Sequence, residues 1–251
     1  MNPFDLGGKT AIVTGSTRGI GRAIAETLIG QGARVVISSE DAADTARVAN
    51  ALGQPGIACD VTDDAALARL VDGADSELGG IDILVCNAGI TGRPGPFAGI
   101  DMADFDRVMA LNLRSQVVLA NLALPHIAAR GGGAAILMAS IAALRGNGAI
   151  NAYALAKAGV AQLARNLAVE WGPRGVRVNA VAPGFIRTEL SAPLLRDHAF
   201  MTRRMAMTPL RRPGEPADVA GAVTFLASAA GAFVTGQTLV VDGGTVITDG
   251  S

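Results

Sequence analysis

Tyr153 and Lys157 are the residues whose types and spacing most directly suggest catalysis. They stand four positions apart in NAYALAK, at the start of a predicted helix over 152–171, so both side chains point from one helix face. A tyrosine has a pKa of about 10, and lowering it by about three units with a nearby cation takes about 4 kcal/mol. The pair predicts a general acid; the alternative is a surface pair whose ring packs on the lysine stem.

Two observations favour the catalytic interpretation. Tyr153 is the only tyrosine in the chain. In addition, Ser140 follows an apolar run, AAILMA, that predicts a strand over 134–138. Ligands of open α/β sheets bind outside the carboxyl ends of the strands. The Ser140 hydroxyl is therefore expected in the active-site crevice.

The segment TGSTRGIG, residues 14–21, joins a predicted strand over 10–14 to a predicted helix over 20–30. Gly15, Gly19 and Gly21 permit positive φ and close backbone approach, and the helix N-terminus offers unpaired N–H groups to a pyrophosphate. The spacing is GxxxGxG and not the commoner dinucleotide fingerprint GxGxxG, so a purely structural turn stays open as the alternative. The position after the first strand favours a cofactor.

Short β-branched runs alternate with longer helical stretches, which indicates an α/β fold with an open, doubly wound parallel sheet and helices on both faces. No linker or internal repeat divides residues 1–251, so a single domain is expected. The predicted strands are 10–14, 34–38, 56–59, 81–86, 134–138 and 176–181, and the predicted helices are 20–30, 42–52, 63–78, 102–129 and 152–171.

Composition excludes several classes of protein. Half of the 251 residues are hydrophobic, 17% are charged and the net charge is −1, which argues against disorder and against nucleic acid or an anionic membrane as partner. No apolar run is long enough to span a bilayer, and a cytoplasmic location is expected. Cys59 and Cys86 fit no metal-ligand spacing, so we expect buried free thiols and no metal site.

Taken together, the motifs resemble the short-chain dehydrogenase/reductase family over essentially the whole chain. The corresponding residues are TGSTRGIG for the family's TGxxxGIG, Asn87-Ala88-Gly89 for its NAG motif, Asn112, Ser140, Tyr153 and Lys157 for its catalytic residues, Pro183-Gly184 with Ile186 and Thr188 for its PGxIxT, and the tail GQTLVVDGG. The resemblance implies a seven-stranded parallel Rossmann sheet. It also implies hydride transfer between NAD(P) and a carbonyl or alcohol.

The resemblance implies a role for each catalytic residue. Tyr153 would exchange a proton with the substrate oxygen, and Ser140 would donate a hydrogen bond to that oxygen as charge develops on it. Lys157 would lower the pKa of Tyr153 and hold the cofactor ribose. Asn112 would bind a water that links Lys157 to solvent; the alternative is a buried amide bonded to a neighbouring carbonyl.

The resemblance likewise implies the cofactor contacts, which are Gly15, Thr17, Arg18, Gly19, Ile20, Gly21, Ser39, Glu40, Asp60, Val61, Asn87, Ala88, Gly89, Tyr153, Lys157, Pro183, Gly184, Ile186 and Thr188. For Asp60 an ordinary capping residue is the alternative. Ser39 stands where NAD-preferring relatives carry Asp, and Arg18 where NADP-preferring relatives often carry a base, whereas Glu40 would repel a 2′-phosphate. The balance favours NADP(H) over NAD(H).

The substrate is harder to read, because its pocket would be formed by variable loops, including a segment over about 185–212. An apolar lining is expected from Ala142, Leu144, Ile150, Phe185, Leu190, Leu194 and Leu195. Arg145 and Arg203 would meet an anionic group or face water. The stretches RGNGAINAY and TPLRRPGEP look most similar to 3-oxoacyl-[acyl-carrier-protein] reductases.

Three functions follow from these observations. They are an NADPH-dependent ketone or 3-oxoacyl reductase, an NAD-dependent secondary alcohol or sugar dehydrogenase, and a non-catalytic cofactor-binding protein. The intact catalytic residues disfavour the last. The resemblance also implies a homotetramer built on the helices of Asn112 and Tyr153.

Overall fold

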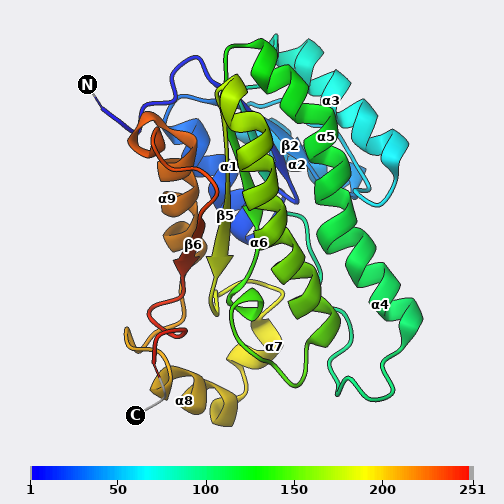
Figure 1. Ribbon diagram of the computed structural model, residues 1–251, viewed down its shortest axis with the longest axis vertical. Coiled ribbons are helices and arrows are strands. Elements are labelled where there is room, and N and C mark those ends of the chain that lie inside the picture. The colour runs from blue at the N-terminus through cyan, green and yellow to red at the C-terminus, as the bar shows by residue number, and fades with distance from the viewer. Residues whose placement is uncertain (1, 249–251) are drawn as a thin grey trace.

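The computed structural model describes residues 2–248, which form a central six-stranded parallel sheet with helices on both faces (Figure 1). The strands are β1 (Thr10–Thr14), β2 (Arg34–Ser38), β3 (Ile83–Cys86), β4 (Gly133–Met138), β5 (Val176–Pro183) and β6 (Thr238–Val241). Their order is β2-β1-β3-β4-β5-β6, and every neighbouring pair is parallel. The order reverses direction between β1 and β3, so a crevice forms there at the carboxyl ends of the strands.

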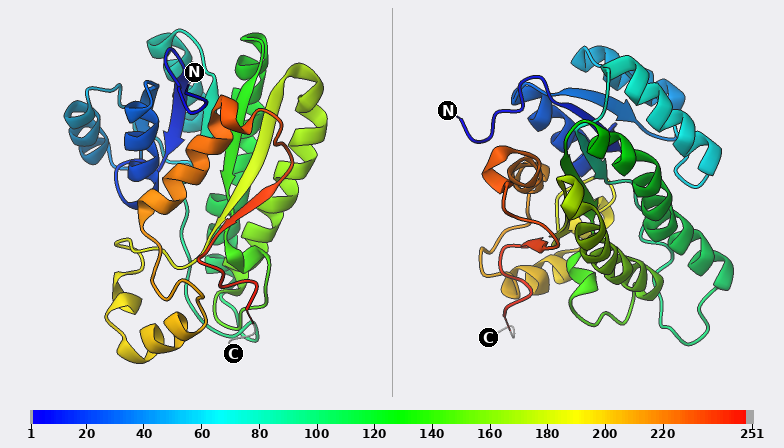
Figure 2. Two further views of the ribbon diagram at one scale, coloured as in Figure 1. Left: turned by 90° about the vertical axis from the view of Figure 1, so that its left-hand side faces the viewer. Right: turned by 45° about the horizontal axis from the view of Figure 1, so that its top comes forward.

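The helices separate into two layers, which Figure 2 shows on either side of the sheet. The helices are α1 (Gly19–Gly30), α2 (Ala42–Leu52), α3 (Asp64–Leu78), α4 (Met102–Met109), α5 (Ser115–Ala129), α6 (Asn151–Trp171), α7 (Ala192–Leu195), α8 (His198–Ala206) and α9 (Pro216–Ala227). One buried cluster joins α3, α5 and α6 to one face of the sheet, and another joins α1, α2 and α9 to the other. Neighbouring strand residues alternate between them: Ile12 belongs to the first cluster and Val13 to the second.

Four helices begin at an aspartate whose carboxylate accepts a hydrogen bond from a backbone N–H of the first turn. These N-caps are Asp41 of α2, Asp63 of α3, Asp101 of α4 and Asp197 of α8. Such caps stabilise a helix by about 1 kcal/mol each and complement its dipole. These aspartates thus mark where the four helices start.

The predicted strand over 56–59 does not form, and the sheet has six strands and not the seven that the resemblance implies. This segment does run beside β2: Ile57 N donates to Ile37 O, and Cys59 N donates to Ser39 O, both at 2.9 Å. The pairing amounts to a single bridge between Ile37 and Gly56. It is not extended because β2 ends at Ser38, where the chain turns toward α2.

The long helix predicted over 102–129 is interrupted. A π-helical turn, Ala110–Arg114, separates α4 from α5 and contains Asn112. Single π turns within α-helices occur frequently at functional sites. The other predicted elements are confirmed, several of them with identical bounds, such as 10–14, 34–38 and 42–52.

Cys59 and Cys86 are free and buried, as expected. Burial raises the pKa of the Cys59 thiol to about 11 and that of Cys86 to about 12, so neither is a thiolate near neutral pH. Among the described residues, no helix combines the length and apolar character needed to cross a bilayer.

Candidate active site

The glycine loop after β1 is shaped for close contact with a ligand backbone. Gly15 and Gly19 have φ values of +63° and +55°, which side-chain-bearing residues rarely adopt. A Cβ at Gly21 would collide with the carbonyl oxygen of Gly15 and with the amide of Asn87. Glycine is thus required at each of the three positions for a conformational or a packing reason.

The N-terminus of α1 is left open by this loop. Its N-cap residue, Arg18, makes no side-chain capping hydrogen bond, and no acidic residue stands in the first turn. The N–H groups and the positive end of the helix dipole are therefore available to an anion, unlike those of the four helices capped by aspartate. Of the other residues predicted in this loop, Thr17 is buried and Ile20 packs against the core.

Asn87 connects the glycine loop to the end of β3. Its amide Nδ2 donates to Thr14 O at 2.9 Å and Gly15 O at 3.2 Å, while its backbone N and that of Ala88 donate to Thr14 Oγ1. A Cβ placed on Gly89 would lie 2.8 Å from Asn112 Oδ1 and 3.5 Å from Lys157 Nζ. The Asn87-Ala88-Gly89 segment thus runs from the glycine loop to the catalytic residues.

Thr14 is a site residue that sequence reasoning did not assign. Its hydroxyl accepts both backbone hydrogen bonds that hold the Asn87 segment against β1. The available signal was a hydroxyl residue at the last position of the first strand, within the motif TGSTRGIG.

Ser140, Tyr153 and Lys157 are brought together at the carboxyl end of β4. Ser140 directly follows Ala139 after β4, is buried, and accepts a hydrogen bond from Ala142 N at 3.1 Å. Lys157, one helical turn beyond Tyr153 on α6, places Nζ 5.5 Å from the centre of the tyrosine ring. Its Nζ also donates to Met138 O at 2.7 Å, which holds the buried side chain in place.

Burial dominates the acid–base properties of this group. It lowers the pKa of Lys157 to about 8, and it raises the pKa of Tyr153, although hydrogen bonding to Ser140 acts in the opposite direction. In the chain without a bound cofactor, the pKa of Tyr153 is raised and not lowered. The reason is that the ammonium donates to the Met138 carbonyl while the phenol lies in a desolvated setting.

Asn112 is fully buried in the π turn and its amide is satisfied by the protein. Nδ2 donates to Ile90 O at 2.8 Å and to Val108 O at 3.0 Å, and Oδ1 accepts from Ile90 N at 3.1 Å. These bonds match the alternative of a buried amide bonded to neighbouring carbonyls. They also place Asn112 against the Gly89 segment, and its role in a water relay to Lys157 stays a prediction.

At the other end of the crevice, Arg18 and Glu40 lie together. Arg18 Nη2 is 3.8 Å from Glu40 Oε1, and both side chains are more than 60% exposed, at 64% and 68%. Ser39 is buried, with Oγ accepting a hydrogen bond from Asp41 N. The two residues whose charges predict opposite cofactor preferences therefore form one surface ion pair.

Asp60 and Val61 lie near this end as well, after the segment that runs beside β2. Asp60 Oδ1 accepts hydrogen bonds from Thr62 N at 2.8 Å and Thr62 Oγ1 at 2.7 Å, so the carboxylate forms a local turn. Asp60 therefore does not cap a helix, since Asp63 caps α3, and its contact with a cofactor stays a prediction. Val61 is buried in the core.

The segment after β5 closes the crevice from the opposite side. Pro183 ends β5, and a Cβ on Gly184 would lie 2.7 Å from Asp242 Cα. A Cβ on Gly19 would lie 3.5 Å from Thr188 Cγ2, so Thr188 faces the glycine loop. Ile186 is buried behind it.

Three of the seven residues of the predicted apolar lining are exposed, whereas Ala142 is buried and the other three are partly buried. Leu144, Leu190 and Leu194 are 44%, 64% and 43% exposed. A cavity of about 520 Å³ between this segment and the chain after β6 is lined by Phe185, the one predicted lining residue that it contains, and by Ile186, a predicted cofactor contact. The apolar substrate pocket stays a prediction.

Comparison with known proteins decides the family. The profile described as enoyl-(acyl carrier protein) reductase matches residues 15–246. The cis-4-hydroxycyclohexanecarboxylate dehydrogenase of Sinomonas cyclohexanicum is 42% identical, over 94% of this chain and 96% of that protein. The chain belongs to the short-chain dehydrogenase/reductase family. It is an oxidoreductase of that family, as its sequence motifs indicated.

Other members of the family show how widely such chains differ in what they bind. The 3-oxoacyl-[acyl-carrier-protein] reductase of Vibrio cholerae is 38% identical over 96% of this chain and 98% of that one. A gluconate 5-dehydrogenase of Burkholderia cenocepacia, in complex with NADP and tartrate, has a TM-score of 0.95 at 35% identity and covers 98% of each chain. A 7α-hydroxysteroid dehydrogenase, complexed with NADH and a 7-oxo bile acid, has a TM-score of 0.91 at 40% identity and covers 96% of each chain.

Proposed function

We propose that this protein transfers a hydride between NADP(H) and a ketone or secondary alcohol, with ketone reduction as the main direction. The observation that carries the proposal is the convergence of Ser140, Tyr153 and Lys157 at the carboxyl end of β4, beside the segment that leads to the glycine loop. A 3-oxoacyl substrate is one candidate, by similarity to the Vibrio reductase.

The residues present fit a dinucleotide. Gly21 lets the start of α1 pack closely against the glycine loop at Gly15, and the N-terminus of α1 has unused N–H groups for a pyrophosphate. Lys157 would bind the ribose next to the nicotinamide, and Thr188 with the Ile186 backbone would hold its carboxamide. A bound nicotinamide supplies or accepts the hydride.

The chain's own groups would handle the proton. Tyr153 protonates the substrate oxygen in reduction and removes its proton in oxidation, and Ser140 donates a hydrogen bond to that oxygen where negative charge develops. For this role the pKa of Tyr153 must fall from its raised value. Positive charge on Lys157 and on an oxidised nicotinamide acts in that direction.

The cofactor preference rests on the pair of Arg18 and Glu40. Because both side chains are exposed and 3.8 Å apart, their ion pair is weak, and a 2′-phosphate dianion would compete with Glu40 for the guanidinium. We therefore favour NADP(H). The alternative, an NAD-dependent alcohol or sugar-acid dehydrogenase, is supported by Glu40 itself, since a carboxylate there accepts hydrogen bonds from free ribose hydroxyls.

Assembly and location complete the proposal. Exposed apolar side chains lie at the start of α4 and along α6, at Met102, Leu155 and Val169, and Phe233 and Ile247 are exposed before and after β6. Exposed apolar side chains on α4 and α6 are consistent with a homotetramer that uses these helices as contacts. The free buried thiols suit the reducing cytoplasm.

A substrate panel tests the reaction. Purified protein is assayed in both directions, with NADPH and NADH or their oxidised forms, on cis-4-hydroxycyclohexanecarboxylate and its ketone, gluconate, a 7-hydroxy bile acid and a 3-oxoacyl thioester. The Tyr153→Phe variant should lose activity about a hundredfold or more while still binding cofactor. Activity that survives this change would refute the assigned acid.

A further inference from the structure

Arg204 occupies an unusual position among the arginines of this chain. On α8, its guanidinium lies 5.7 Å from the ring centre of Phe185 and 5.4 Å from that of Phe200. These two rings pack edge to face, 5.3 Å apart. The side chain is half-buried, and within residues 2–248 its guanidinium has no carboxylate or hydrogen-bond acceptor.

Many of the other arginines in the described residues are paired with acids, and others, such as Arg177 and Arg196, donate to backbone carbonyls. Arg114 binds both carboxylate oxygens of Asp64 at 2.6 Å, and Arg212 binds those of Asp218 at 2.6 and 3.0 Å. These pairs join segments that the fold must hold together. Arg204 instead rests on two rings that leave its N–H groups without a partner, and arginine carries five such donors in a planar fork.

Two further positive charges stand near Arg204. Burial lowers the pKa of Arg204, and the charges of Arg145 and Arg203 lower it further. Arg145 is partly buried in the loop after Ser140, and in the described part of the chain it too has no acidic partner. Like charges gathered in a partly dry place destabilise the protein unless an anion joins them.

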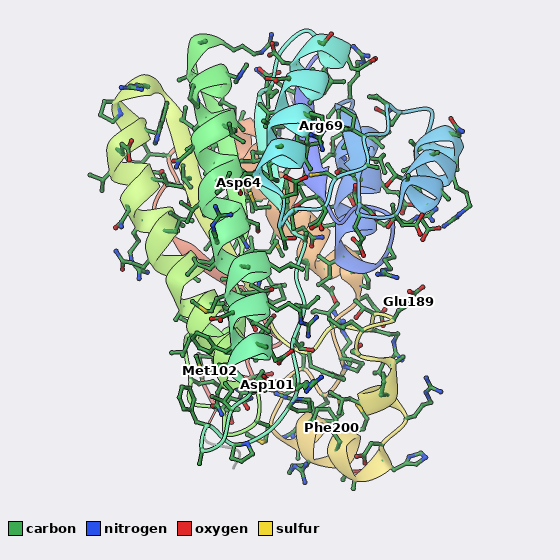
Figure 3. All side chains as sticks on the ribbon, turned by 90° about the vertical axis from the view of Figure 1, so that its right-hand side faces the viewer. Asp64, Arg69, Asp101, Met102, Glu189 and Phe200 are labelled. Carbon is green, nitrogen blue, oxygen red and sulfur yellow. The ribbon has the colours of Figure 1, made fainter. Side chains whose placement is uncertain are left out.

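The position of this cluster relates it to the active site. Phe185 directly follows the Pro183-Gly184 turn at the end of β5, and Arg145 belongs to the loop that begins at Ser140. In Figure 1, α7 and α8 lie beyond the carboxyl ends of the strands. Figure 3 shows Phe200 at the same end of the molecule as Asp101 and Met102, where α4 begins.

We infer that Arg204, with Arg145 beside it, binds a carboxylate that the substrate carries away from its reacting carbon. Leu144, which precedes Arg145, and Leu190, in the segment between Phe185 and α8, are exposed, which suits an apolar ring or chain. The substrate class is thus a hydroxy or oxo acid with an apolar body. The reaction part of this inference rests on the proposed function, whereas the binding part does not.

A single negative charge fits this setting better than a phosphate dianion. The guanidinium fork matches a carboxylate with two parallel hydrogen bonds. The aromatic and aliphatic surroundings make a second charge expensive to desolvate. A carboxylate on the substrate would also fix the orientation of the ring or chain, and with it the face of the carbonyl presented to Tyr153.

Binding is measured first, on a protein that cannot turn over. Tyr153→Phe is saturated with NADPH, and 4-oxocyclohexanecarboxylate and its methyl ester are titrated by calorimetry. We expect the acid to bind at least about tenfold more tightly than the ester, because a charged bidentate contact is stronger than a neutral one. Adding Arg204→Leu should remove that difference, and Arg204→Lys should restore part of it, since lysine keeps the charge but not the fork.

A matched control is Arg196→Leu, an exposed arginine of the same segment whose Nε contacts only the Ala192 carbonyl. It should leave the acid-to-ester ratio unchanged. Arg145→Leu is the second variant: it keeps the packing of Phe185 and Phe200 and should reduce the ratio even if Arg204→Leu does not fold. Equal loss of acid and ester binding in Arg204→Leu, with no effect of Arg145→Leu, would show a merely structural role and overturn the inference.

Kinetics then separates the two claims. In the chain with Tyr153 intact, the acid should be reduced with kcat/KM about tenfold or more above the ester, and Arg204→Leu should raise KM for the acid with little change for the ester. Reduction of both at equal rates would refute the carboxylate site and leave the reaction class standing. Arg204-dependent binding of the acid without turnover of any substrate would refute the proposed reaction and support the site.

Discussion

Lys157 should lower the free energy of unfolding of the protein, because its position in the active site buries a charged side chain. Burial moves the pKa of this lysine from its ordinary 10.5 to about 8. Each pKa unit corresponds to about 1.36 kcal/mol, so at pH 7 the charged side chain costs the folded state about 3 kcal/mol. The Lys157→Met variant removes this charge. It also leaves the Met138 carbonyl without its donor, at about 1–2 kcal/mol, so a net gain of about 1–2 kcal/mol is expected at pH 7.

The pH dependence gives the sharper test, because it does not depend on the lost hydrogen bond. A lysine with a lower pKa in the folded state binds fewer protons there than in the unfolded state at pH values between about 8 and 10.5. The stability of the parent chain relative to Lys157→Met must therefore rise with pH over that window. Between pH 7 and 9.5 the advantage of the variant should shrink by about 2 kcal/mol.

Urea unfolding of both chains at several pH values between 7 and 9.5, followed by circular dichroism, measures this difference. Lys9→Met is the control, since the other lysine of the chain is 53% exposed and should give no gain at pH 7. A difference between parent and Lys157→Met that stays constant with pH would show that the lysine is not penalised by burial. The variant should at the same time lose activity, which distinguishes a functional lysine from a misplaced one.

Three other predictions follow from the structure. Gly21→Ala should abolish cofactor binding, measured by fluorescence titration with NADPH, because its Cβ would overlap the Gly15 carbonyl; Gly30→Ala, in open space on the same helix, should bind normally. Arg18→Ala should weaken NADPH binding about tenfold or more and NADH binding little, and equal weakening would count against the NADP(H) proposal. Asp82→Asn should reduce the free energy of unfolding at pH 7 by about 3 kcal/mol, because the buried carboxylate accepts hydrogen bonds from Thr10 and Arg130. Burial raises the pKa of Asp82, but the hydrogen bonds from Arg130 and Thr10 lower it more, so the net pKa is lowered. The stabilisation by Asp82 is therefore present above about pH 4 and is lost as the pH falls through the lowered pKa. Urea unfolding of both chains at pH 7 and pH 3 measures this loss.

The sequence predicts those parts of the fold that depend on local pattern. Apolar runs such as TAIVT and RVVIS gave β1 and β2 with their observed bounds, and the aspartate caps explain where α2 and α3 begin. The predicted strand over 56–59 did not form, because pairing at the edge of a sheet depends on the path of the neighbouring strand. Periodicity over 56–59 carries no information about the turn that ends β2 at Ser38.

The break in the long middle helix was also invisible to pattern reasoning. Residues 102–129 keep a helical composition throughout, and the interruption comes from a tertiary contact, in which the Asn112 amide bonds both the N–H and the carbonyl of Ile90. An asparagine in a helix interior competes with the backbone for hydrogen bonds. The hydrogen bonds that the Asn112 amide makes are determined by the Gly89-Ile90 segment, which follows β3 and packs against Asn112.

The spacing of Tyr153 and Lys157 also could not predict how burial acts on the two pKa values before a cofactor binds. Spacing shows that the two side chains share a helix face, but it does not show that Lys157 Nζ donates to Met138 O or that the phenol is desolvated. The contacts of Arg204 could not be predicted from the sequence for the same reason. Its sequence neighbour Arg203 was a candidate for an anion contact, yet the structure buries Arg204 against Phe185 and Phe200.

Lys157 and Arg204 share a feature that locates function in this fold. Both are cations withdrawn from water with no carboxylate partner in the described residues, and burial lowers the pKa of each. The fold does not lack acids to pair with them, since Asp64, Asp82 and Asp218 are all used to hold arginines elsewhere. Arg177 at the start of β5 is also a partly buried cation without a carboxylate partner, but the carbonyls of Leu226 and Ser228 accept its hydrogen bonds. The Arg204 guanidinium has no such acceptor among the described residues, which suits a ligand. We therefore expect an anionic substrate group to be the ligand that balances Arg204, whereas the cofactor would offer Lys157 ribose hydroxyls and no negative charge.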